Sequence, residues 1–362
     1  MSFEDILLTI ISRMDGERYK HAAFHLMKGK RSGQTLQDTE YYGLHPFFGM
    51  LPSLSGTDFD RAYNGLLEKG RISESPEGIV RLTMAGNERA RALPDSRLNG
   101  WVYRGKEQVF FSRLSLAVQS LSHLMSGIRG FLPVTNDPAI QQDVRRHLLA
   151  ALKTRSPDDF RMEMTHSLEQ SGMDGERLSR LVARLSGNGL TGLTWTQLSE
   201  LSGLEVIDLK AEFVESLHIW LQVIENGRYP LLSGFAEGLR PSSPLTGSAR
   251  KTEELYRKGV TLEEIAARRG LKISTIEDHF IEIAINDPVF PLGRFVSDDC
   301  AETVMAEMNR LATRKLSLLK KKFPELSYFQ LRLIMARAGK EESDGNERTG
   351  ESDRAAEADH RA

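Results

Sequence analysis

The chain has 362 residues, enough for two or three compact domains, and a formal net charge of −2. This charge excludes a global basic field, so any nucleic-acid site has to be a local patch. The single cysteine, Cys300, excludes an internal disulfide framework and a metal site built from several cysteines. The apolar run at 3–11 is too short to span a membrane and lacks signal-peptide flanks, so we expect a cytoplasmic protein without membrane contact.

Residues 1–92 have the pattern of a winged helix. Apolar residues recur at helical spacing in 3–14, 17–28 and 57–68. Gly70 then leads into two short strand-like runs, 71–73 and 79–82, which Pro-Glu-Gly separates. Thr83 can cap a short helix after them. The sequence therefore predicts an N-terminal winged-helix-like module.

Basic residues mark two segments of this module. Lys28, Lys30 and Arg31 lie in a glycine-bearing run, residues 28–35, that we expect to be a loop. Such loops combine free backbone N–H groups with positive charge and bind phosphate readily. The predicted hairpin adds Arg71 and Arg81. A solvated connector explains the loop equally well, so nucleic-acid contact is one of two interpretations.

The middle of the chain is predicted to be helical. A segment rich in Pro, Ser, Asn and Gly, 93–100, precedes a helical region at 101–230. Residues 231–247 contain Pro-Ser-Ser-Pro and several glycines, which indicate an interdomain linker. We recognise no nucleophile–base motif, metal cluster or nucleotide-binding loop, so we expect a protein that is not an enzyme and needs no cofactor.

Residues 248–338 contain the pattern of a helix-turn-helix. Three short helices are expected, at 248–258, 262–269 and 275–284, with Thr261 and Ser274 as N-caps. Gly259 and Gly270 suit the turns between them. Spacing of this kind is typical of a helix-turn-helix whose last helix enters a major groove, although a three-helix packing unit that touches no DNA is the alternative.

The charges of this unit favour weak DNA binding. Residues 248–284 carry seven basic and seven acidic side chains. The basic residues Arg268, Arg269 and Lys272 cluster just before the third helix, whose N-terminus also attracts anions. That helix itself offers Ser274, Thr275 and His279 to DNA, alongside acids that would repel phosphate unless they face away. We therefore expect phosphate contact at the turn and a weak or partner-assisted binder.

The last part of the chain continues the helical pattern and then changes character. Helices are expected over about 298–322 and from residue 327, and the lysine-rich run at 314–322 is either a solvated helix face or a further basic patch. Residues 339–362 are polar without apolar periodicity and are predicted to be a disordered tail. The predicted fold class is mainly α.

The helix-turn-helix pattern and the wider chain both resemble known families. Residues 252–259, 262–266, 269–271 and 274–276 resemble the helicase helix-turn-helix domain at the C-terminal end of some RecQ-family helicases. The whole chain is similar to the YpbB family of Firmicutes. The residues that carry this similarity are 16–18, 25–30, 32–35, 47–49, 52–54 and 327–333. This resemblance implies a non-catalytic protein, usually encoded beside a RecQ-like helicase.

Three functions follow as hypotheses. The first is an accessory DNA-binding protein that acts with a RecQ-like helicase in DNA repair or recombination, with DNA and the helicase as partners. The second is a helix-turn-helix transcriptional regulator, which the lack of Arg, Asn or Gln on the third helix disfavours. The third is a protein-interaction scaffold whose helix-turn-helix binds protein.

Overall fold

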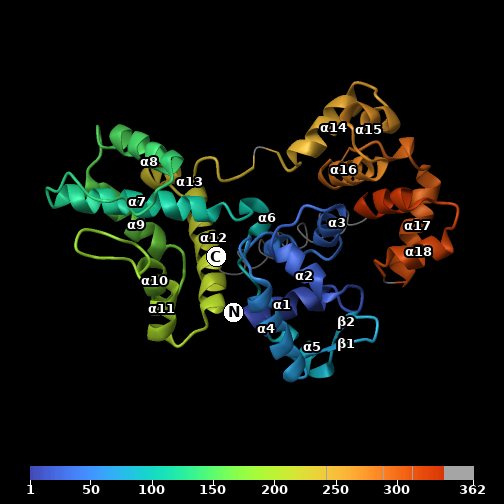
Figure 1. Cartoon of the computed structure of the whole chain (residues 1–362), viewed down its shortest axis with the longest axis horizontal. Helices are drawn as coiled ribbons and strands as arrows, with labels where there is room; N and C mark the ends of the chain where they lie inside the picture. The colour runs from blue at the N-terminus through green and yellow to red at the C-terminus, as the bar shows by residue number, and fades with distance from the viewer. Residues whose placement is uncertain (242, 288, 312, 338–362) are drawn as a thin grey trace, which may run out of the picture.

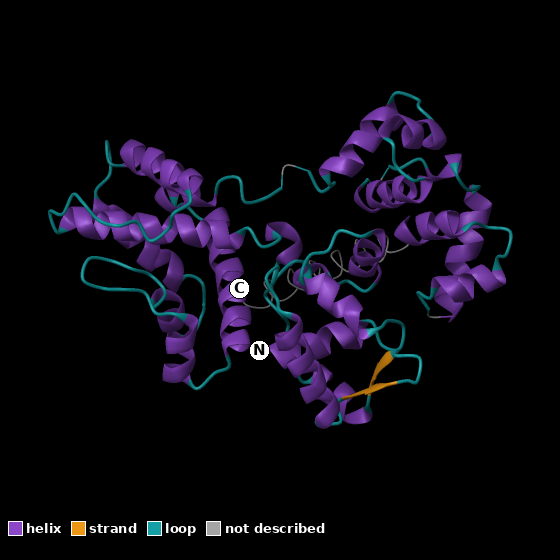
Figure 2. Cartoon of the chain, viewed as in Figure 1, coloured by secondary structure: helices purple, strands orange, loops and turns teal. Residues whose placement is uncertain are grey.

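The computed structural model describes residues 1–241, 243–287, 289–311 and 313–337. The described chain is mainly helical, and one two-stranded sheet is present in it (Figures 1 and 2). The predicted fold class, mainly α, is confirmed. In Figure 1 the blue N-terminal helices lie at the centre, with the green and yellow middle helices on one side and the orange and red C-terminal helices on the other.

The N-terminal part combines helices with the hairpin that the sequence predicted. Its elements are α1 Phe3–Arg13, α2 Lys20–Met27, α3 Gly33–Tyr41, η1 His45–Phe47, α4 Gly56–Glu68, β1 Ile72–Glu74, β2 Val80–Leu82 and α5 Met84–Arg91. The strands pair antiparallel with Ile72 opposite Leu82. Thr83 caps α5 as expected, since its side chain accepts a hydrogen bond from the Gly86 N–H.

Helix α3 is an element that the sequence analysis missed. The expected loop over 28–35 is wrong in its second half, because Ser32 caps a helix that begins at Gly33. Eight of its nine residues are buried although most of them are polar. A helix without an apolar stripe gives no periodic signal, and only its tertiary partners explain the burial.

The middle part is a helical unit with a core of its own, and α12 also contributes Ala211 and Val214 to the core of the other two parts. Its helices are α6 Gly100–Tyr103, α7 Glu107–Met125, α8 Pro138–Ala151, α9 Pro157–Glu169, α10 Gly175–Val182, α11 Trp195–Ser202, α12 Val206–Asn226 and α13 Pro230–Ala236. The linker expected over 231–247 is wrong in its first half. Helix α13 occupies it and contributes Leu232 and Phe235 to the middle core, because these apolar side chains pack on α7 and α9.

The C-terminal part contains the predicted helix-turn-helix. Its elements are α14 Gly247–Arg257, α15 Leu262–Arg269, α16 Ile273–Asn286, η2 Leu292–Arg294, α17 Asp298–Leu311 and α18 Leu316–Lys322, and residues 328–337 are helical. Thr261 and Glu264 form a reciprocal capping box at the start of α15, and Gly270 ends it at φ 61°. The expected Ser274 cap is wrong: α16 begins at Ile273, with Lys272 at the N-cap position.

The two ends of the chain share one hydrophobic core. Helix α16 packs against α3, and buried residues from 3–98 and 260–336 form a single cluster. Glu17 adds a polar connection, since its carboxylate accepts hydrogen bonds from the Thr313 hydroxyl at 2.7 Å and the Arg314 N–H at 3.0 Å. The described structure therefore joins the N-terminal and helix-turn-helix modules. The predicted tail, 339–362, lies outside the described residues.

Candidate nucleic-acid interface

Helix α16, the expected DNA-reading helix, is covered along most of its length. Helix α14 packs on it from within the helix-turn-helix, and α3 packs on it from the N-terminal module. Its buried residues are Ile276, His279, Phe280, Ile281, Glu282, Ile283, Ala284 and Ile285. Ile273 and Ser274, with Lys272 before them, are exposed, and Thr275 is half-buried. The first turn is therefore the most exposed part of the helix.

His279, predicted to face DNA, is instead buried inside the domain. Its ring is 8 % exposed, and its Nδ1 lies 2.9 Å from the Thr252 hydroxyl on α14. Arg269 donates a hydrogen bond to the same hydroxyl oxygen, so the hydroxyl hydrogen is left to point at His279. Burial, and then the charge of Arg269, lowers the pKa of His279 and so favours the neutral ring. His279 joins two helices of the domain.

The three basic residues of the predicted turn differ in their partners and exposure. Arg269 donates hydrogen bonds to the Ser248 carbonyl oxygen at 2.8 Å and to the Ser248 hydroxyl at 2.9 Å. These bonds hold the end of α15 against the start of α14, so Arg269 is a structural residue rather than the predicted phosphate contact. Arg268 and Lys272 are exposed on either side of it.

The acidic residues of α16 are largely turned to internal partners. Asp278 forms an ion pair with Arg332, with Oδ1 2.6 Å from Nη2. Glu282 is buried and accepts hydrogen bonds from the Thr246 N–H and hydroxyl. Burial raises the pKa of Glu282, and the bonds from Thr246 oppose that rise. Two of the three carboxylates that would repel phosphate therefore face protein groups.

The N-terminus of α16 has the properties of an anion site. Lys272 makes no side-chain hydrogen bond at the cap, whereas Thr246 and Thr261 cap the other two helices of the motif. Uncapped N–H groups and the helix dipole attract negative charge. Arg268 and Lys272 add two exposed cations at the same end. This turn is the part of the helix-turn-helix best suited to a phosphate.

The predicted N-terminal loop lies beside the helix-turn-helix. Lys28 donates a hydrogen bond to the Leu54 carbonyl at 3.0 Å, so its ammonium group is partly engaged. Lys30 and Arg31 are exposed. Lys28 and Arg31 line one cavity together with Arg250 of α14. No local sequence pattern predicts that these residues line one cavity, because about 220 residues separate the loop from α14.

The hairpin contributes less positive charge than expected. Arg71 lies within 3.9 Å of the carboxylates of Glu4 and Asp5 on α1, so part of its charge is balanced. Arg81 is exposed, and its side chain packs beside Gly16. Of the two predicted hairpin cations, Arg81 is the one whose charge faces solvent.

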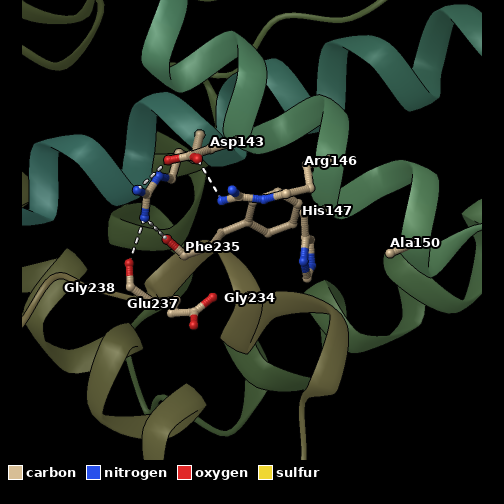
Figure 3. A pocket seen from close by; sticks show the side chains of 9 residues that line it. Asp143, Arg146, His147, Ala150, Gly234, Phe235, Glu237 and Gly238 are labelled. Carbon is tan, nitrogen blue, oxygen red and sulfur yellow. Dashed lines mark hydrogen bonds and ion pairs between the residues drawn. The ribbon is translucent and has the colours of Figure 1, made fainter.

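The middle unit contains a cavity whose lining includes charged side chains (Figure 3). It measures about 530 Å³ and lies among α7, α8 and α13. Asp143 pairs with Arg113 at 2.8 Å and with Arg146 at 2.7 Å, and Arg113 also donates to two backbone carbonyls. His147 occupies the space that a Cβ on Gly234 would need. These groups bind one another and hold α13 in place, which indicates a structural role.

Two further properties concern membrane spans and metal ligands. None of the helices in the described ranges is long and apolar enough to cross a membrane. Among the same residues, no group of three or more His, Cys, Asp and Glu side chains could hold a metal ion.

The fold and the interface define a mainly helical helix-turn-helix protein. A family model described as "Helix-turn-helix domain" matches residues 248–335, which supports DNA binding. The chain is 28 % identical over 348 residues to "Protein YpbB" of Bacillus subtilis (strain 168), covering 92 % of this chain and 97 % of that protein. The predicted resemblance to the YpbB family is thereby confirmed. No solved structure matches it.

Proposed function

We propose that this chain is a non-catalytic accessory protein that binds DNA and acts with a RecQ-like helicase in DNA repair or recombination in the cytoplasm. One observation carries the DNA-binding mode. The first turn of α16 is exposed, uncapped and flanked by Arg268 and Lys272, while α14 and α3 pack on the rest of the helix. A helix presented in this way meets phosphates rather than base edges.

The same observation disfavours a sequence-specific regulator. Direct readout needs several side chains of a recognition helix inside the major groove. Helix α16 would have to leave α3 before it could enter a groove, and that would expose its apolar face to water. Little sequence preference is therefore expected from this domain.

The helicase partnership rests on family resemblance and on a physical argument. The resemblance to the YpbB family implies a RecQ-like helicase beside this protein. A domain that contributes only a few phosphate contacts binds DNA weakly by itself. A tether to a helicase raises its effective concentration on DNA, so weak contacts suffice.

The test compares DNA binding by the full chain with and without the RecQ-like helicase encoded nearest to it. Fluorescence anisotropy on random duplexes, genomic duplexes and forks, repeated over a salt series, gives affinity and salt slope. We expect weak, salt-dependent binding with little sequence preference, and tighter binding when the helicase is present. A strong site bound by the chain alone would favour the regulator. Binding to the helicase without any contact to DNA would favour the scaffold.

A further inference from the structure

A basic cavity lies where the N-terminal module, the middle unit and the helix-turn-helix meet. It measures about 470 Å³, a size common among small-ligand pockets. Five cations line it: Lys28 and Arg31 from the loop before α3, Arg104 and Lys106 before α7, and Arg250 on α14. The rest of the lining is glycine, proline, serine and apolar side chains, without a carboxylate.

The five cations of this cavity differ in their partners from three half-buried arginines elsewhere in the chain. Elsewhere, Arg18, Arg177 and Arg332 each hold a carboxylate within 2.9 Å. Within the described ranges, none of the five cavity cations forms an ion pair. Glu282 feels the charge of Arg31, but Thr246 already bonds both of its oxygens. Several like charges around one concavity raise the local concentration of anions.

Arg104 is held in place for a ligand by groups that leave its charge intact. Its guanidinium lies 4.2 Å from the centre of the Trp101 ring. Its Nε donates to the Trp101 carbonyl at 2.9 Å, and its Nη1 donates to the Pro244 carbonyl at 3.3 Å. Carbonyl oxygens and an aromatic face orient a guanidinium without neutralising it, and further N–H donors of its five are left for an anion.

The backbone of Arg104 is also unusual. It has φ 51°, which makes it the non-glycine residue with positive φ in the described part of the chain. A side chain in this conformation is sterically unfavourable, and such residues cluster at ligand sites. Glycine would adopt this φ without strain, but position 104 is an arginine that lines the basic cavity.

We propose that this cavity binds phosphate groups, as a site additional to the N-terminus of α16. A guanidinium fixed over Trp101 can bind two phosphate oxygens at once, while Lys106 and Arg250 supply mobile charge at the rim. The phosphate belongs either to a nucleic-acid backbone or to a free nucleotide or polyphosphate. Where it belongs to DNA, the inference rests on the proposed function. Where the phosphate belongs to a small molecule, the inference is independent of the proposed function.

The first experiment measures inorganic pyrophosphate binding to the full chain by calorimetry and by thermal unfolding. We expect binding that raises the melting temperature, because a ligand that binds only the folded state stabilises it. The variant Arg31→Gln, Arg104→Gln, Arg250→Gln should lose at least tenfold in affinity. The matched control, Arg91→Gln, Arg129→Gln, Arg145→Gln, removes the same charge at exposed, unpaired positions and should bind normally. Absence of pyrophosphate binding by the native chain at low salt, or equal loss in both variants, would overturn the site.

A second variant separates binding from folding. Arg104→Gly introduces a residue that adopts φ 51° without strain, so the variant should fold. Far-ultraviolet circular dichroism would verify the fold. Its pyrophosphate affinity should fall, and the Trp101 fluorescence change on binding should disappear. Undiminished pyrophosphate affinity in this folded variant would remove Arg104 from the site and contradict the proposal.

Competition with DNA identifies the source of the phosphate. If pyrophosphate displaces a bound oligonucleotide and the cavity variant weakens DNA binding, the site takes backbone phosphates. If DNA binding is unchanged while pyrophosphate and ATP bind in the cavity, the site takes a free phosphorylated molecule. Failure of all DNA binding would count against the proposed function and leave the pyrophosphate result standing, so the two claims fail separately.

Discussion

The Nδ1 atom of His279 on α16 lies 2.9 Å from the hydroxyl oxygen of Thr252 on α14. Arg269 at the end of α15 donates to that same hydroxyl, so one residue from each helix of the motif joins a single chain of hydrogen bonds. Two residues that the sequence assigned to DNA, Arg269 and His279, thus hold the domain together. The surface left for DNA is the turn between α15 and α16.

The buried ring of His279 makes stability depend on pH. Burial holds the pKa of His279 below its ordinary value of 6.5 in the folded chain. The unfolded ring takes up a proton at about pH 6.5 and the folded ring resists it, so the unfolded state binds more protons there. The free energy of unfolding should therefore fall as pH drops below about 6.5. Urea unfolding between pH 5 and 8 measures it.

The variant His279→Asn tests whether this ring causes the effect. An amide cannot titrate in this range, so the fall in stability below about pH 6.5 should become shallower. His21→Asn is the control, because His21 is exposed on α2. A pH profile unchanged by His279→Asn would show that other groups produce the dependence.

The predicted basic turn should separate into a binding pair and a structural residue. Arg268→Ala with Lys272→Ala should flatten the slope of log affinity against log salt by up to about two units, because each lost phosphate contact removes about 0.9. Arg269→Ala should leave the slope unchanged and lower stability by about 1–3 kcal/mol, since charged hydrogen bonds to Ser248 and Thr252 are lost. Anisotropy and urea unfolding measure the two effects. A flattened slope in Arg269→Ala at full stability would restore its predicted role.

A capping residue at the start of α16 should raise the stability of the domain and weaken its DNA binding. Lys272→Asp supplies a side chain that can accept hydrogen bonds from the first turn, which should raise stability by about 0.5–1 kcal/mol. The same change puts a negative charge where a phosphate is expected, so DNA binding should weaken by more than in Lys272→Ala. Wild-type DNA affinity in a stabilised Lys272→Asp variant would exclude this helix terminus from the interface.

The contact between α3 and α16 should control the exposure of α16. Arg332 donates to the Gln37 side-chain oxygen at 3.0 Å and pairs with Asp278. Arg332→Ala should cost about 1 kcal/mol, because Asp278 is partly solvated, and should speed amide hydrogen exchange in both helices. Arg310→Ala is the control, since its pair with Glu307 is exposed. Equal exchange rates in the two variants would show that α3 is not held on α16 by Arg332.

The sequence by itself determined the features that depend on neighbouring residues. Thr261 and Glu264 cap α15, and Gly270 ends it, because capping and positive φ act within one turn of the chain. The hairpin after α4 was predictable for the same reason. The helix-turn-helix was therefore visible before any tertiary contact was known, as was the mainly α fold class.

Only the tertiary structure decided which of those residues face a ligand. Helix α3 is polar in sequence and buried in the fold, since its partners, such as Arg18 for Asp38 and Arg332 for Gln37, come from distant segments. No local pattern marks His279 as internal or brings Arg104 to Arg250, 146 positions apart in the sequence. Local rules set where helices begin and end, whereas burial and charge pairing depend on side chains that folding brings together.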